Sequence, residues 1–227
     1  MSTAQADDAG LMFAFAHDLR AHLRTIMTRI QLVQRGGGAR LSSEEQAMLQ
    51  EATLAVDKIG GLLTELLAYQ DAKAGERIME LALVLRGSIM ETKPTLSAAG
   101  AHVDLANDLH VRVHTGLQKV IKELLVNACK FRDQNHPLRI RIASRLLAGE
   151  AIEISVSDNG VGVAPMYLER IFIPFHSLHS RDEFPGFGLG LATCRRIIAD
   201  CGGTIIAESA AEGGLMIRMT LPAESSS

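Results

Sequence analysis

The spacing of the apolar residues changes near Ala74 and Gly75, and this change constrains the fold more than any other feature of the sequence. Before it, apolar residues recur every three or four positions, which is the period of an amphipathic helix. After it, short alternating runs, the pattern of half-buried strands, are mixed with helical patterns. A chain of 227 residues is long enough for two domains. We therefore expect a helical domain over residues 9–73 and a mixed domain over residues 76–223.

The helical domain is predicted to be a hairpin. The first helix has the four-and-three spacing of a coiled-coil seam, at Met12, Ala16, Leu19, Leu23, Ile26, Ile30 and Val33. Gly36–Gly38 end this helix, and Ser42 or Ser43 with Glu45 indicates a capped restart. The second helix repeats the seam from Met48 to Tyr69 and adds a second apolar stripe at Val56, Leu63 and Leu67. One hairpin cannot cover both stripes, so we expect a homodimer in which two hairpins form a four-helix bundle.

The mixed domain is predicted to be an α+β sandwich, a sheet under a layer of helices. Strands are expected at 102–105, 139–142, 152–156, 204–207 and 215–221, and helices at 83–96, 116–131 and 189–200. Ile152, Ile154 and Val156 alternate with polar residues, so their strand should have one buried face and one wet face.

Composition excludes several classes of protein. A formal net charge of −3 and the absence of Trp give no reason to expect a nucleic-acid partner. No apolar stretch approaches the roughly 18 residues of a membrane-spanning helix, and no signal peptide precedes the hairpin. The cysteines lack the spacing of a disulfide framework or a zinc site, which favours a reducing compartment. We therefore expect a cytoplasmic chain without a membrane segment.

Polar residues on the predicted helix at 116–131 form the first candidate site. Glu123 and Asn127 share one face, and Lys130 follows one turn later. An oxygen-bearing pair with a lysine suits a Mg²⁺–phosphate site, because Mg²⁺ takes few protein oxygens and keeps several waters. An ordinary solvated helix surface has the same composition, and both interpretations stay open.

Two glycine-containing segments form further candidates. Asp158 ends a predicted strand and is followed by Gly160 and Gly162, so it can bind an exocyclic amine while a flat ligand approaches the backbone. The alternative is an ordinary Asn-Gly turn. A second cluster, Gly186, Gly188 and Gly190, opens the helix at 189–200, where N–H groups can bind phosphate, or it is a plain loop.

The segment 164–185 before the second glycine cluster has the length and polarity of a mobile cover over a site. It contains His176 and His179, but no Cys or carboxylate frames them at ligand spacing, so we expect no metal there. On the first helix, His17 falls just outside the apolar seam. An exposed imidazole can act as a nucleophile, oriented by the neighbouring Asp18, although most histidines at such positions are uninvolved.

The order and spacing of five segments resemble the H, N, G1, F and G2 boxes of the sensor histidine kinase family. They are His17-Asp-Leu-Arg, Asn127-Ala-Cys-Lys-Phe, Asp158-Asn-Gly-Val-Gly, Phe172-Ile-Pro-Phe and Gly186-Phe-Gly-Leu-Gly-Leu. The run from Phe175 to Gly186 looks most like kinases related to bacterial phytochromes. The resemblance covers nearly the whole chain. It implies a dimerisation and phosphotransfer hairpin followed by a Bergerat-type ATP-binding domain.

The resemblance also implies residue roles. His17 would accept the γ-phosphoryl group of ATP, Asp18 would orient and activate it, and Arg20 would help to hold the phosphate. Metal and phosphate would be bound by Asn127, Glu123 and Lys130. The base and the phosphates of ATP would be bound by Asp158, Gly160, Gly162, Gly186, Gly188, Gly190 and Thr220, the last of these beside adenine. The phosphoryl group would then pass to an aspartate of a response-regulator receiver domain.

Three positions depart from the family pattern. His22 stands where the family has a proline that bends the helix, so the bend should be weakened or lost. Ala21 replaces the Thr or Asn that can orient a water, which predicts weak phosphatase activity. Glu123 stands where the family often has Asn, and an acid at this position can act as a base toward water.

Three functions follow from these patterns. The first is an ATP-dependent protein-histidine kinase. The second is a non-catalytic phosphotransfer or scaffold protein with a degenerate nucleotide domain. The third is an ATPase of the wider fold superfamily that uses Glu123 as its base.

Overall fold

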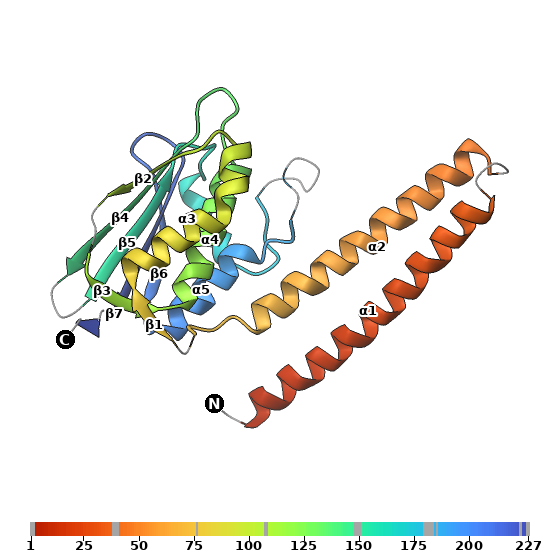
Figure 1. Cartoon of the computed structure of the whole chain (residues 1–227), viewed down its shortest axis with the longest axis horizontal. Coiled ribbons are helices and arrows are strands. Elements are labelled where there is room, and N and C mark those ends of the chain that lie inside the picture. The colour runs from red at the N-terminus through yellow and green to blue at the C-terminus, as the bar shows by residue number, and fades with distance from the viewer. Residues whose placement is uncertain are drawn as a thin grey trace. The chain divides into compact units, whose positions relative to one another are not determined.

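The computed structural model describes residues 3–37, 41–75, 77–106, 109–147, 151–178, 184, 186–222 and 224–225. The chain divides into two compact units with a boundary between Asp71 and Ala72. We call them the hairpin unit and the sheet unit (Figure 1). None of the described helices is long and apolar enough to cross a membrane.

The hairpin unit consists of the helices α1 (Thr3–Gly37) and α2 (Ser43–Gln70). The predicted capping box starts α2: Ser42 Oγ accepts from the Glu45 N–H at 3.2 Å, and the Glu45 carboxylate accepts from the Ser42 N–H at 2.7 Å. The backbone N–H of Ser42, followed by its hydroxyl, lowers the pKa of Glu45. Helix α1 continues through His22, where the chain lacks the helix-bending proline.

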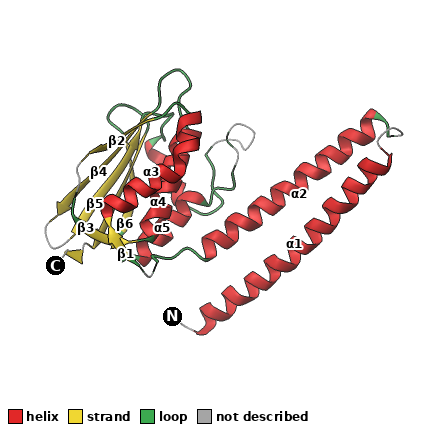
Figure 2. Ribbon diagram, in the orientation of Figure 1, coloured by secondary structure: helices red, strands yellow, loops and turns green. Residues whose placement is uncertain are grey.

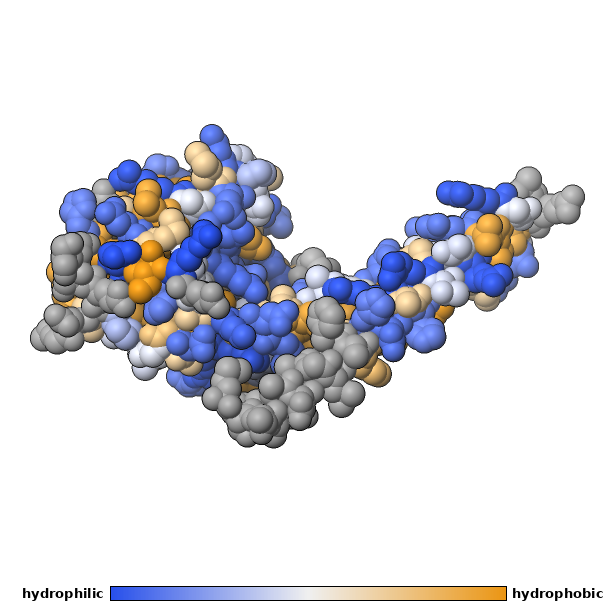
Figure 3. All heavy atoms as spheres, turned by 60° about the horizontal axis from the view of Figure 1, so that its bottom comes forward, coloured by the Kyte–Doolittle hydropathy of each residue, from blue (hydrophilic) through white to orange (hydrophobic). Residues whose placement is uncertain are grey.

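A small apolar core joins α1 to α2. Its residues are Ala16, Leu19, Leu23, Val56, Leu63 and Leu67. Helix α2 therefore packs through its second stripe, around Leu63, while its seam stripe is exposed at Met48 (59%) and Ile59 (43%) and partly buried nearer the end of the helix. The visible surface of the hairpin unit carries hydrophobic patches among hydrophilic residues (Figure 3). On α1, Ile26 and Val33 are also exposed, so only part of the predicted seam packs within the hairpin. One hairpin leaves a second apolar stripe uncovered, as the sequence pattern indicates.

A five-stranded sheet forms the centre of the sheet unit, in the order β2-β4-β5-β7-β6 (Figure 2). The strands are β2 (His102–Ala106), β4 (Arg139–Leu147), β5 (Ala151–Asp158), β6 (Thr204–Ser209) and β7 (Leu215–Pro222). Strand β2 runs parallel to β4, and the other neighbours are antiparallel. One face of the sheet is covered by α3 (Leu81–Ala98), α4 (Gly116–Lys130) and α5 (Gly190–Asp200).

The core lies between this sheet and its helices, and it confirms the predicted sandwich. Ile152, Ile154 and Val156 of β5 are buried, whereas the alternating polar residues of the strand are only partly covered. The free cysteines Cys129, Cys194 and Cys201 also lie in this core. Burial raises the pKa of all three thiols, that of Cys201 to about 11.

A second, smaller sheet was not predicted. It has the order β1-β3-β8, from β1 (Ile78–Glu80), β3 (Val111–His114) and β8 (Glu224–Ser225). Strands of 3, 4 and 2 residues are too short to show an alternating period, so the sequence alone carries no signal for them. Two short 3₁₀ turns, η1 (Pro165–Tyr167) and η2 (Arg170–Phe172), complete the described elements.

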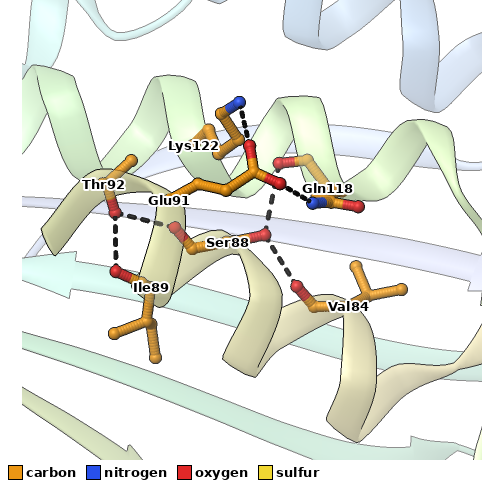
Figure 4. Close-up of polar contacts among 7 residues, drawn as sticks. All are labelled: Val84, Ser88, Ile89, Glu91, Thr92, Gln118 and Lys122. Atoms are coloured by element: carbon orange, nitrogen blue, oxygen red, sulfur yellow. Dashed lines mark hydrogen bonds and ion pairs between the residues drawn. The ribbon is translucent and has the colours of Figure 1, made fainter.

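Polar contacts fix α3 against α4, the helix that carries the first candidate site (Figure 4). Glu91 of α3 accepts hydrogen bonds from the side chains of Gln118 and Lys122 of α4, both at 2.5 Å. The buried Ser88 hydroxyl donates to the Val84 carbonyl at 2.7 Å and lies 3.3 Å from the Gln118 carbonyl. The buried Ser88 hydroxyl is thus paired, whereas the contacts that Glu91 makes across the two helices are exposed to solvent.

Candidate functional site

Helix α4 carries Glu123, Asn127 and Lys130 along one side. The opposite side, including Leu117, Ile121 and Leu125, is buried, which leaves the three polar side chains partly open to solvent. Burial raises the pKa of the Glu123 carboxyl, and the nearby Lys119 and Lys122 oppose this shift. The predicted pair therefore shares a face, and both side chains are partly buried.

The second glycine cluster lies against this side of α4. A Cβ added at Gly186 would come within 2.9 Å of Lys130 Nζ. One added at Gly190 would lie 3.0 Å from Glu123 Oε2 and 3.9 Å from Asn127 Nδ2. Gly190 is also the first residue of α5, so the helix N-terminus, a favourable place for phosphate, faces the carboxyl and amide of α4.

Gly188 holds the middle of this cluster in a left-handed conformation, with φ of +73°. Its carbonyl accepts from the Phe175 N–H at 3.1 Å, and a Cβ here would approach the His176 carbonyl oxygen to 2.8 Å. The segment that contains Phe172 and Phe175 is therefore seated directly on the glycine cluster.

Asp158 lies at the end of β5, on the face of the sheet that the helices cover. Its Oδ1 accepts from the Gly160 N–H at 2.9 Å and from the Leu215 N–H at 3.3 Å. Burial raises the pKa of this carboxyl, and the two backbone N–H groups oppose the shift. Asp158 is thus held by its backbone neighbours in a partly buried position.

The loop after Asp158 is joined to the C-terminal end of α4. The Val161 N–H donates to the Phe131 carbonyl at 3.0 Å, and a Cβ at Gly160 would clash with the same oxygen. Gly162 packs against Gly214, where a Cβ would lie 3.1 Å from the Gly214 carbonyl oxygen. These contacts bring both glycine segments and the α4 residues together, although they are far apart in the sequence.

Thr220 does not lie with these residues. On β7 it pairs with Glu153 and Thr204, whereas the residue that contacts Asp158 is Leu215. From Leu215 to Thr220 a strand rises about 16 Å. The alternation of β7 also places Thr220 on the face away from the helices, since Met219 and Leu221 are buried. This placement corrects the expectation that Thr220 lies beside the base.

In the hairpin unit, His17 is exposed on α1, with 68% of its side chain open to solvent. Its Nδ1 lies 3.4 Å from Asp18 Oδ1. Arg20 turns toward α2, where its guanidinium donates to Thr64 Oγ1 at 3.1 Å. Ala21 and His22 are both exposed. The predicted imidazole is therefore accessible and has a carboxylate at one ring nitrogen.

Several contributors were missed in the sequence. Gly214 and Leu215 close one side of Asp158, and the Gly213-Gly214 pair before a strand could have indicated them in the sequence. No sequence signal indicated that Thr64 accepts a hydrogen bond from Arg20. His176 bonds Arg170 through Nε2 at 3.0 Å, while His179 lies outside the described residues. Within the described parts of the chain, no group of three or more His, Cys, Asp or Glu residues is placed to hold a metal.

Comparison of the sequence with known proteins shows the family to which the chain is similar. Residues 112–225 match the family described as histidine kinase-, DNA gyrase B-, and HSP90-like ATPase. The chain is 30% identical over 216 residues to cyanobacterial phytochrome A of Nostoc sp. (strain PCC 7120), covering 92% of this chain and 28% of the phytochrome. It is 29% identical over 217 residues to the adaptive-response sensory kinase SasA of Synechococcus sp. (strain JA-3-3Ab), covering 91% of this chain and 57% of SasA.

The fold is also similar to that of a solved structure. Full-length ShkA in complex with AMPPNP superposes with a TM-score of 0.70 at 20% identity, over 96% of this chain and 46% of ShkA. The chain spans less than a third of the phytochrome and little more than half of SasA. Because the ATPase family matches half of the chain and both relatives align along more than nine tenths of it, the chain belongs to the histidine kinase-, DNA gyrase B- and HSP90-like ATPase family and, within it, to the sensor histidine kinases.

Proposed function

We propose that this chain is an ATP-dependent protein-histidine kinase that phosphorylates His17. The observation that carries the proposal is the convergence of Glu123, Asn127 and Lys130 with Gly186 and Gly190 at the start of α5. This arrangement offers a carboxyl, an amide, an ammonium group and a helix N-terminus to one ligand, which suits a polyphosphate. ShkA, which shares the fold, was solved with AMPPNP.

The proposed nucleotide site divides into a base end and a phosphate end. At the base end, Asp158 accepts a hydrogen bond from the adenine amine through Oδ2, since both backbone N–H groups contact Oδ1. At the phosphate end, Lys130 and the N–H groups of α5 contact phosphate oxygens. The oxygens of Glu123 and Asn127 would hold a Mg²⁺ ion, and the ion would neutralise phosphate charge.

The acceptor is proposed to react through His17 Nε2. Asp18 lies at Nδ1, so the neutral ring keeps its proton there and presents the Nε2 lone pair to the γ-phosphorus. The Nε2–P bond forms as the bond from phosphorus to the β-γ bridging oxygen breaks, and ADP leaves with that oxygen. Asp18 stabilises the positive charge on the ring and takes the Nδ1 proton, which leaves a neutral imidazole ring bonded through Nε2 to the anionic phosphoryl group.

The hairpin unit is proposed to form a homodimer through its uncovered stripe, which includes Met48 and Ile59. The same unit would pass the phosphoryl group from His17 to an aspartate of a response-regulator receiver domain. Ala21 has no side-chain group that can orient a water near the phosphoramidate, so we propose that dephosphorylation of this partner is weak.

Labelling with γ-³²P ATP and Mg²⁺ tests the proposal. The wild-type chain should take up acid-labile, alkali-stable label, and His17→Gln should take up none while it binds nucleotide normally. Asn127→Ala should lose both label and nucleotide affinity. His22→Gln, an exposed histidine on the same helix, is the matched control and should label like the wild type. Nucleotide binding by the wild type without label on His17 would contradict the proposal.

One observation favours ATP hydrolysis as a second candidate. The partly buried Glu123 has a raised pKa and lies beside Gly190, where a carboxylate can act as a base toward water. In that case the wild type should release free phosphate without labelling His17, and Glu123→Gln should abolish the release. If Glu123→Gln instead lowers labelling and phosphate release stays at background, the kinase proposal stands.

A further inference from the structure

The segment that follows α2, residues 72–75, is built into the sheet unit. Ala72 and Ala74 are 3% and 7% exposed and belong to its core, while Lys73 between them is exposed. Helix α2 ends at Gln70, so Asp71 alone separates the helix from the first buried residue of this linker segment. The connection between α2 and the first buried residue of the sheet unit is therefore one residue long.

The backbone of Ala74 joins the ends of two helices. Its N–H donates to Asp200 Oδ2 at 2.7 Å, and its carbonyl accepts from the Gly116 N–H at 2.5 Å. Asp200 is the last residue of α5, and Gly116 is the first residue of α4. The opposite ends of these helices carry Gly190 and Lys130, which belong to the proposed phosphate end of the nucleotide site.

The close fit around the linker segment leaves no space for other side chains. A Cβ at Gly116 would clash with the Ala74 carbonyl oxygen and lie 2.7 Å from that of Lys73. Gly75 has a left-handed φ of +84°, and its carbonyl lies 3.2 Å from His114 Nδ1. Local helix stability does not explain why a carboxylate stands at position 200, because a carboxylate at a helix C-terminus opposes the helix dipole. The hydrogen bond that Asp200 accepts from the Ala74 N–H explains it.

We propose that Asp200 is a positioning residue for phosphoryl transfer, acting through the backbone of Ala74. It holds the linker segment so that the chain from the hairpin unit always enters the sheet unit at the same point, between the start of α4 and the end of α5. A short fixed tether raises the effective concentration of one reacting group near the other, and a released one lowers it. The inference rests on the proposed kinase function.

Trypsin gives a direct readout of the linker, because its cleavage site after Lys73 is the peptide bond whose N–H donates to Asp200. The full chain is compared as wild type, Asp200→Ala, which removes the acceptor, and Asp200→Asn, which keeps an acceptor oxygen. Glu212→Ala, an exposed carboxylate in the turn before β7, is the matched control. Mass spectrometry follows the fragment that ends at Lys73. Labelling of His17 is measured at saturating ATP, and nucleotide affinity is measured with a fluorescent ATP analogue.

Asp200→Ala should be cut after Lys73 about tenfold faster, because the Ala74 N–H loses the oxygen that accepts its hydrogen bond. Its labelling at saturating ATP should fall about three- to tenfold while nucleotide affinity stays within about twofold. Asp200→Asn and Glu212→Ala should resemble the wild type. If Asp200→Ala loses nucleotide affinity through misfolding, Asp200→Ser, whose shorter side chain cannot span the distance, is judged on the same measurements.

Faster cleavage with an unchanged labelling rate would overturn the positioning role, as would unchanged cleavage. A wild-type chain that binds nucleotide and protects Lys73 but never labels His17 would instead overturn the proposed function. The two failures are therefore distinguishable. A fall in labelling that Asp200→Asn restores together with protection of Lys73 supports the inference, since a general loss of stability would also weaken nucleotide binding.

Discussion

The two units place their chemistry in opposite ways. In the hairpin unit, the exposed imidazole of His17 stands on a regular helix with Asp18 beside it. In the sheet unit, the candidate site exists only because α4, the loop after β5 and the start of α5 converge over one face of a sheet. The accessibility of His17 thus depends on little structure, whereas the proposed polyphosphate site depends on a folded core. Damage to the two units should therefore have different consequences.

Matched core substitutions test this difference with the largest expected effect. Leu63→Ala in the hairpin unit and Ile154→Ala in the sheet unit each remove a buried side chain and should cost about 2–5 kcal/mol of unfolding free energy. Ile154→Ala should weaken nucleotide binding, whereas Leu63→Ala should leave it intact and destabilise only the hairpin. Thermal unfolding by circular dichroism with and without nucleotide measures both. Equal loss of nucleotide binding in the two variants would contradict the comparison.

Asp158→Asn addresses the convergent site without removing core volume. The amide can still accept the Gly160 N–H but does so without charge, and it binds the adenine amine less well. Nucleotide affinity should fall about tenfold to a hundredfold, corresponding to about 1.5–3 kcal/mol. Isothermal titration measures this change. Asp133→Asn, at a partly exposed position just before a turn, serves as the control and should bind nucleotide as the wild type does.

Ile59→Lys tests whether the hairpin unit forms a dimer through its uncovered stripe. The side chain is exposed in the isolated hairpin, so the substitution should cost the monomer little, but a charge on the uncovered stripe should weaken a dimer at least about tenfold. Sedimentation equilibrium measures the dissociation constant. Asp57→Lys, two positions away on an exposed surface, is the matched control. A dimer insensitive to Ile59→Lys would show that another surface forms it.

The smallest expected effect concerns the capping box of α2. Ser42→Ala should cost the hairpin unit about 1 kcal/mol, because one N–H of the first turn loses its acceptor. The lowered pKa of Glu45 means that its contribution is present above the ordinary value of 4.5 and is lost as the pH falls through the folded-state pKa. Glu45→Gln should remove this acid-dependent part of hairpin stability. Helicity measured between neutral and acid pH distinguishes the variants.

Periodicity and local motifs were enough to predict the hairpin and the main sheet, and several residues proposed for the site lie close together in the fold. Asn127 and Glu123 share a face by helix geometry alone, and Gly160 is recognisable by its place after a strand. Thr220 was misplaced because the register of β7 against β5 depends on long-range pairing, which no local pattern shows. The bond from Ala74 to Asp200 spans 126 residues, so it too could be found only in the folded chain.

The native thiols have a practical consequence. Cys129, Cys194 and Cys201 are all buried with raised pKa values, so they should react slowly with maleimides at neutral pH. A cysteine introduced at an exposed position of α1, such as Thr28, would then react with a fluorophore much faster than the three buried cysteines. Energy transfer from that dye to a labelled nucleotide would report the approach of donor and acceptor during a turnover, with every natural cysteine left in place.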